Sequence, residues 1–256
     1  MSGAERIAGA FAKPDRRAAL MPYLMGGFPT LDAARRIGAA YVAGGADLIE
    51  LGVPFSDPLA DGPVIHAAGV TALAAGARVE TVLELGAELS SAVPVVVMCY
   101  ANLVFAHGAE AFATGLAQAG VSGLIVPDLP LEEASPVRDA CDAAGVALVP
   151  LVAPTTPDER FAAIGAQARG FLYAVSVVGT TGERADGDVS AVVDRARSNT
   201  AVPVAVGFGI ATPERAAEAA AAGADGVIVG SRLVRAVADG EDVEALVRDF
   251  SAALTR

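Results

Sequence analysis

The chain has 256 residues, of which 54% are hydrophobic, and its 30 acidic and 18 basic residues give a formal net charge of −12. This acidic balance argues against nucleic acid as a partner, because the overall field repels a phosphate backbone. No apolar run reaches the ~20 residues of a membrane-spanning helix and no export signal follows the first residues, so we expect a cytoplasmic protein with one domain, residues 1–256.

The segment before the first predicted strand is expected to form an extra N-terminal helix that closes the bottom of a barrel. It also contains Lys13, the single lysine of the sequence. Schiff-base chemistry needs a lysine amine at the reacting centre, and Lys13 lies too early in the chain for that position. A lysine aldolase or a pyridoxal-phosphate enzyme is therefore not expected.

Short β-rich runs then alternate with alanine-rich helical stretches along the chain. The runs begin near Leu20, Asp47, Val95, Gly123, Val146, Gly170, Val202 and Gly226. This alternation is typical of parallel strands with crossover helices. An open doubly wound sheet would show the same pattern, but evenly spaced units favour closure, so we predict an α/β fold of the (β/α)8 TIM barrel type. Catalytic residues should then lie at the carboxyl ends of the strands.

The second predicted strand, residues 47–52, carries a carboxylate among apolar neighbours. Successive side chains on a strand face opposite sides, so Glu50 enters the barrel lumen if Ile49 and Leu51 face the helices. Lost hydration favours the neutral form of such a carboxylate and suits it to proton transfer. The alternative is a structural pair with an arginine. We predict that Glu50 is catalytic.

The loop after this strand contains three prolines and two acids, Asp57 and Asp61. Either acid could simply accept backbone hydrogen bonds in a turn. Asp61 is the stronger candidate because its loop directly follows the strand that carries Glu50. We predict that it is the second catalytic carboxylate.

Aromatic and thioether side chains near other strand ends could line an apolar slot beside Glu50, although core packing is the alternative for each. These residues are Tyr23, Met98, Tyr100, Tyr173 and Phe208.

Glycines follow the last three predicted strands, where barrels commonly build a phosphate site. Backbone N–H groups of Gly182, Gly209 and Ser231 could converge on one anion, and Gly230-Ser231 opens a helix whose dipole would assist. A single glycine of this kind is usually only a turn residue, but three on consecutive strands predict a phosphate-binding site.

Metal ligands and disulfides are not expected. The two histidines, His66 and His107, do not begin a ligand spacing, and the two cysteines, Cys99 and Cys141, fall inside a predicted strand and a predicted helix.

The stretch LIELGVPFSDPLADGPVI, residues 48–65, resembles the signature of the tryptophan synthase α subunit family. Further matching motifs follow in the family's order at residues 22–24, 27, 29, 98–102, 126–130, 153–156, 173, 179–182 and 207–210. The resemblance covers nearly the whole chain. It departs from the commoner pattern at residues 25–27, at His66, which we interpret as a helix-surface histidine, and at Thr180.

The resemblance implies retro-aldol cleavage of indole-3-glycerol phosphate to indole and glyceraldehyde 3-phosphate, without a metal or a cofactor in this chain. Glu50 would take the proton of the glycerol hydroxyl and deliver one to indole C3, which becomes the electron sink. Asp61 would hold the indole N–H and stabilise the developing positive charge. Tyr173 would help to position the pair, and Thr181 would contact Asp61 when its loop closes.

The family also implies a partner, a β subunit that carries pyridoxal phosphate, in an α2β2 tetramer. The partner face would include Pro54, Phe55, Asp57, Asn102, Asp128 and Pro130.

Two alternatives remain open at this stage. One is another phosphate-binding barrel, such as an isomerase or an indole-releasing lyase that acts alone. The other is a subunit that only binds ligand and regulates its partner.

Overall fold

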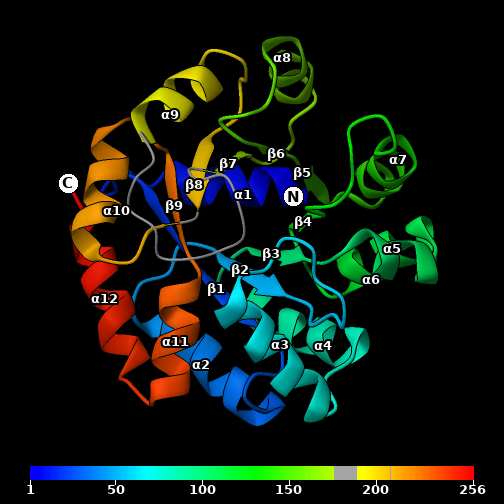
Figure 1. The fold of residues 1–256 in the computed structure, drawn as a ribbon, viewed down its shortest axis with the longest axis vertical. Helices are drawn as coiled ribbons and strands as arrows, with labels where there is room; N and C mark the ends of the chain where they lie inside the picture. Colours follow the sequence, from blue (N-terminus) through cyan, green and yellow to red (C-terminus); the bar gives the residue numbers. More distant parts are fainter. Residues whose placement is uncertain (176–188, 208) are drawn as a thin grey trace.

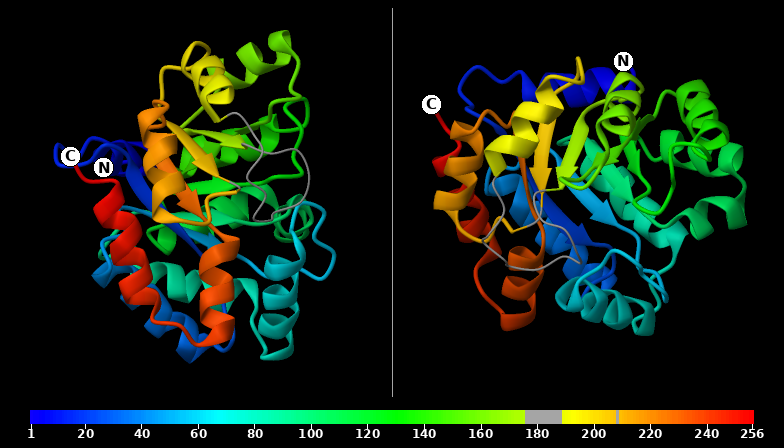
Figure 2. Two further views of the ribbon diagram at one scale, coloured as in Figure 1. Left: turned by 60° about the vertical axis from the view of Figure 1, so that its left-hand side comes forward. Right: turned by 45° about the horizontal axis from the view of Figure 1, so that its top comes forward.

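The computed structural model describes residues 1–175, 189–207 and 209–256. Parallel strands form one sheet in the order β5-β4-β3-β2-β1-β9-β8-β7-β6, surrounded by helices (Figures 1 and 2). The strands are β1 (Ala19–Met25), β2 (Ile49–Gly52), β3 (Val95–Met98), β4 (Gly123–Ile125), β5 (Ala147–Val149), β6 (Leu151–Val152), β7 (Leu172–Val175), β8 (Val204–Gly207) and β9 (Gly226–Val229). Since β5 and β6 follow each other directly, the sheet is a nearly closed barrel, which confirms the predicted fold.

The helices of the described residues follow the strands in the expected alternation. They are α1 (Gly3–Phe11), α2 (Leu31–Ala43), α3 (Pro63–Ala74), α4 (Val79–Ser90), α5 (Ala101–His107), α6 (Ala109–Gln118), α7 (Ser135–Ala144), α8 (Asp158–Ala166), α9 (Val189–Arg197), α10 (Pro213–Ala221), α11 (Ser231–Asp239) and α12 (Val243–Ala253). No helix within the described residues is both long enough and apolar enough to cross a membrane.

The fifth predicted strand is present but divided at Pro150, which separates β5 from β6. Proline has no N–H group to donate to a sheet. Its carbonyl still accepts a 3.0 Å hydrogen bond from the Tyr173 backbone N–H, so the barrel wall continues across the break. Every other predicted strand starts within two residues of an observed one.

The extra helix α1 lies across the amino-terminal end of the barrel (Figure 1). Ile7 and Ala10 are buried in the same core cluster as the lumen residues Met21 and Val96. A Cβ atom at Gly170 would lie 2.9 Å from Ile7 Cδ1, so the helix fits closely against the strand ends. The predicted plug is confirmed.

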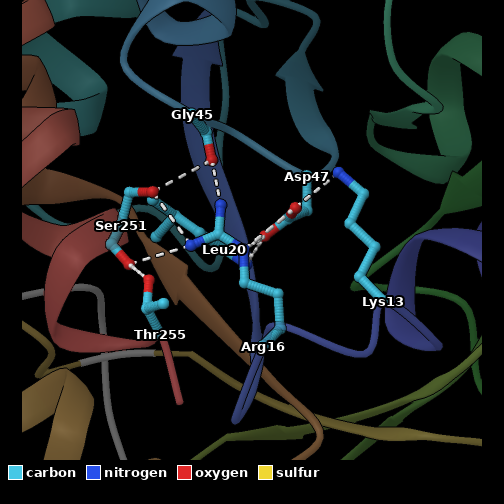
Figure 3. Close-up of polar contacts among 7 residues, drawn as sticks. All are labelled: Lys13, Arg16, Leu20, Gly45, Asp47, Ser251 and Thr255. Carbon is cyan, nitrogen blue, oxygen red and sulfur yellow. Dashed lines mark hydrogen bonds and ion pairs between the residues drawn. The ribbon is translucent and has the colours of Figure 1, made fainter.

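A buried ion network joins this end of the barrel to the last helix (Figure 3). Asp47 receives the Lys13 ammonium at 2.7 Å, the Arg16 guanidinium at 3.0 Å and the Leu20 N–H at 2.9 Å. Arg16 also donates to Ser251 of α12 and to the Gly45 carbonyl. The single lysine therefore pairs with an acid that precedes β2, far from the carboxyl ends of the strands.

Candidate active site

Glu50 points into the barrel lumen. Its strand neighbours Ile49 and Leu51 belong to the outer core with helix residues such as Leu85, whereas Leu48 belongs to the lumen cluster. Because side chains alternate along a strand, Glu50 shares the side of Leu48. Its side chain is buried, with 2% of the residue exposed, and burial together with the Asp61 charge raises its pKa to about 8.

Asp61 lies at the end of the loop that leads from β2 into α3. The Tyr100 hydroxyl donates a 2.8 Å hydrogen bond to Asp61 Oδ1 and accepts one of 3.1 Å from the Ala60 N–H. Partial burial raises the pKa of Asp61, while the Tyr100 hydrogen bond and nearby His66 act in the opposite direction. Tyr100 is the N-cap residue of α5, just after the end of β3. Its two hydrogen bonds hold the loop after β2 at the carboxyl end of the barrel.

Two buried tyrosines flank Glu50 in the lumen. Tyr23 is the register partner of Glu50 on β1, and Tyr173 lies on β7. Each phenol occupies the space above a glycine of the neighbouring strand. A Cβ atom at Gly52 would lie 2.0 Å from the Tyr23 hydroxyl oxygen, and one at Gly207 would lie 2.2 Å from that of Tyr173. The glycines are needed for this close approach.

The electrostatics of this group are coupled. Burial, followed by the charges of Asp61 and Glu50, raises the pKa of Tyr23 well above its usual value. Burial and the Glu50 charge do the same for Tyr173. Both phenols thus stay protonated, and the nearby charges of Asp61 and Glu50 favour this form. The cluster can bind an apolar ring, hold a proton and release it.

The remaining predicted pocket residues divide into two groups. Met98, at the end of β3, packs against the lumen cluster and against the cluster that contains Tyr23 and Met25. Phe208 and Thr181, together with Thr180 and Gly182, lie outside the described residues.

Part of the predicted phosphate site is described. Gly209 has a φ of +76°, a left-handed conformation that favours glycine. Gly230 is the N-cap of α11 and Ser231 is its first residue, so the start of this helix, with the positive end of its dipole, lies at the carboxyl end of β9. Gly230 is also adjacent to the site, because a Cβ there would lie 3.9 Å from Tyr23 Cβ.

The predicted partner-face residues come from the loops after β2 and β4 and from the start of α5, and Pro54 among them is buried. Phe55 stacks on Tyr100 with ring centroids 5.4 Å apart, and Asp128 accepts a 2.8 Å hydrogen bond from the Ala101 N–H at the start of α5. Asp57, Asn102 and Pro130 are exposed. Leu59 beside them is 77% exposed, which is unusual for a leucine and adds an apolar group that the sequence reasoning did not include.

Two sets of interactions, one at the site and one at the other end of the barrel, were not predicted from the sequence. Tyr100 was predicted only as a pocket residue, yet its hydroxyl binds Asp61, a partner 39 positions away. The network around Asp47 was not predicted at all, although two cations before the first strand and an acid at the start of the second were a usable signal.

His66 is exposed in the first turn of α3, as its helix-surface interpretation predicted. Within the described residues, no group of three His, Cys, Asp or Glu side chains is arranged to hold a metal ion.

The family model described as tryptophan synthase alpha chain matches residues 10–255. A tryptophan synthase alpha chain of Methanosarcina mazei is 48% identical over 243 residues, which cover 93% of this chain and 90% of that protein. One from Prochlorococcus marinus strain MIT 9313 is 48% identical over 226 residues, covering 87% and 82%.

Solved structures agree with the sequence relatives. A chain in a structure of Mycobacterium tuberculosis tryptophan synthase superposes with a TM-score of 0.93 at 39% identity and covers 98% of both chains. The crystal structure of the alpha subunit from Legionella pneumophila strain Paris gives a TM-score of 0.89 at 34% identity, covering 99% of this chain and 98% of that one.

Proposed function

Since the chain belongs to the tryptophan synthase alpha chain family, we propose that its lumen carboxylates Glu50 and Asp61 carry out the reaction of that family. The chain is a carbon–carbon lyase of tryptophan biosynthesis. It cleaves indole-3-glycerol phosphate to indole and glyceraldehyde 3-phosphate, and it passes indole to a β subunit.

The observation that carries the residue assignment is the buried Glu50 with its raised pKa, in a lumen that opens beside Asp61. A carboxyl group that titrates near neutral pH can accept and return a proton in one turnover. Glu50 takes the proton of the glycerol hydroxyl and delivers one to indole C3. The protonated indole ring then accepts the electrons of the breaking carbon–carbon bond.

Asp61 faces the ring nitrogen in this proposal. Its carboxylate accepts the indole N–H and stabilises the positive charge that grows on the ring. The Tyr100 hydroxyl holds Asp61 in place through the 2.8 Å hydrogen bond. Tyr173 and Tyr23 position the ring and Glu50 from opposite sides, with Met98 as a further wall, and Phe208 and Thr181 complete the pocket.

The phosphate of the substrate binds to backbone N–H groups at Gly209, Gly230 and Ser231, together with Gly182. The position of α11 supports this assignment, because a helix that starts at the carboxyl end of β9 directs its N–H groups and its dipole toward an anion bound there.

The β subunit binds at the face formed by Pro54, Phe55, Asp57, Asn102, Asp128 and Pro130, in an α2β2 assembly. Pyridoxal phosphate belongs to that subunit, and this chain works without a cofactor as a single domain, residues 1–256. The apolar Leu59 and the stacked Phe55 support a protein contact here.

The test is indole release from indole-3-glycerol phosphate by the purified chain, with and without a tryptophan synthase β subunit. Slow release that the partner accelerates supports both the reaction and the coupling. Fast release that ignores the partner indicates a stand-alone lyase. Partner activation without any release indicates a regulatory subunit, and no release in either condition rules out the assigned roles.

A further inference from the structure

A small cavity of about 110 Å³ lies between the broken fifth strand and helices α7 and α8. Apolar side chains dominate its wall, among them Leu129, Leu131, Leu148 and Ile164. Its polar part is formed by Arg138 and Gln167. None of the carboxylates or tyrosines of the candidate active site lines it, so this cavity is a separate feature of the fold.

The cavity exists because two parts of the outer core meet here without merging. Leu148 of β5 packs with the large cluster that includes α7, whereas Leu131 and Ile164 pack with the cluster around α8 and α9. Pro150 divides the strand between these two clusters. The resulting seam is bridged at its polar end by a hydrogen bond from Arg138 to the Gln167 side chain.

Arg138 retains free donor capacity at this position. One Nη atom donates to Gln167, the other donates to Ser135 Oγ at 3.0 Å, and Nε lies 3.7 Å from Asp139. A guanidinium group has five N–H donors. The second N–H of each Nη atom has no acceptor among the described residues, and the side chain is only 22% exposed, so its charge is partly shielded from water.

We propose that this cavity is a binding site for a monocyclic aromatic carboxylate. The ring occupies the apolar part between Leu131, Leu148 and Ile164, and the carboxylate accepts hydrogen bonds from the remaining N–H groups of Arg138. An apolar protein cavity of ~150 Å³ takes up benzene, so this smaller cavity of about 110 Å³ has no room for two rings. A carboxylate matches the geometry of a guanidinium group.

The site shares a loop with the proposed partner face. Pro127 and Leu129 line the cavity, while Asp128 between them caps α5 through the Ala101 N–H. A ligand at this site therefore contacts the segment that carries Asp128 and Pro130, although the proposal does not depend on the assigned reaction.

The experiment uses benzoate and toluene as probes on the full chain with labelled Ile, Leu and Val methyl groups. We expect benzoate to shift the methyl signals of Leu131, Leu148 and Ile164 saturably, with a Kd on the order of 1 mM. Toluene should bind more weakly because it lacks the carboxylate.

Two variants test the two parts of the site. Ala134 lines the cavity, so Ala134→Leu should fill it and weaken both probes at least about tenfold, while Ala87→Leu on the exposed face of α4 should leave binding unchanged. Arg138→Gln should weaken benzoate about tenfold and leave toluene unaffected. Signals that do not shift, or shifts that persist in Ala134→Leu, would overturn the site, and equal binding of benzoate to Arg138→Gln would overturn the carboxylate assignment.

Discussion

Asp47 and Glu50 are both buried acids, three positions apart in the sequence, but they lie at opposite ends of the barrel. Asp47 is surrounded by donors, with the Lys13 ammonium, the Arg16 guanidinium and the Leu20 N–H all within 3.0 Å (Figure 3). Glu50 has no ion pair with any described arginine or lysine, and burial and the Asp61 charge raise its pKa to about 8.

The difference separates a structural acid from a reactive one. The charges of a buried carboxylate and its cations compensate each other. Removing either partner leaves an uncompensated buried charge and lowers the free energy of unfolding. A buried carboxylate without them sits near its titration point and can exchange protons at neutral pH. The same residue chemistry thus supports stability at one end of the barrel and reactivity at the other.

The largest effect is expected for Glu50→Gln, which removes the proton-transfer group but keeps its shape. Indole release should fall by about 10³-fold, within the range attributed to positioned acids and bases. The variant should still fold, because glutamine is neutral like the protonated acid. A steady-state assay beside a thermal unfolding curve checks both, and an active variant would remove Glu50 from the mechanism.

The pH dependence of stability should also distinguish Glu50 from Asp47. The folded pKa of Glu50, about 8, lies above the ordinary value of 4.5, so the folded chain binds more protons than the unfolded chain in this window. The free energy of unfolding should therefore fall as pH rises from 4.5 to 8, by roughly 4 kcal/mol from this group alone.

Urea unfolding of the natural chain and of Glu50→Gln at pH 5 and pH 8.5 isolates this contribution. Between these two pH values, the free energy of unfolding should fall less in Glu50→Gln than in the natural chain, by roughly 4 kcal/mol. Parallel curves for the two proteins would show that Glu50 is ionised more easily than its environment indicates.

Asp47→Asn tests the other end of the barrel. It leaves Arg16, whose side chain is only 10% exposed, without its counter-ion, and should lower the free energy of unfolding by about 3 kcal/mol. Indole release per folded molecule should stay unchanged. The matched control is Asp32→Asn, at an exposed ion pair with Arg35, where we expect less than about 0.5 kcal/mol.

Asp61→Asn should reduce indole release by about 10²-fold, since it removes a charge that faces the reacting ring but keeps an acceptor for the Tyr100 hydroxyl. Binding of the β subunit should persist, which a pull-down or titration with the partner can measure. If release survives this change, the role assigned to Asp61 is wrong.

The smallest effect is expected for Lys13→Met. The lysine side chain is 44% exposed, and Arg16 remains beside Asp47, so the free energy of unfolding should change by about 1 kcal/mol or less. Indole release should be unchanged. A large loss of indole release would indicate that Lys13 takes part in the reaction.

The barrel and the direction of Glu50 could be predicted because both follow from local periodicity. Strand starts were found within two residues, and alternation around Ile49 and Leu51 placed Glu50 in the lumen correctly. The division at Pro150 was also visible in principle, since proline interrupts a strand ladder.

Contacts between distant segments could not be predicted in the same way. The bond from Tyr100 to Asp61 depends on how the loop after β2 folds over β3, and the bond from Arg16 to Ser251 joins residues 235 positions apart. A single sequence contains no periodic signal for either pair. The cavity beside α7 and α8 was missed for the same reason, because it arises from imperfect packing of two core clusters.

The position of Lys13 has a practical consequence for attaching this molecule to a surface. It is the only side-chain amine of the sequence, and it lies at the floor of the barrel beside Asp47. An amine-reactive support that couples to this side chain would therefore present every copy with the same end outward. The loops around Glu50 and Asp61 would then face the solution, open to substrate and to the partner subunit.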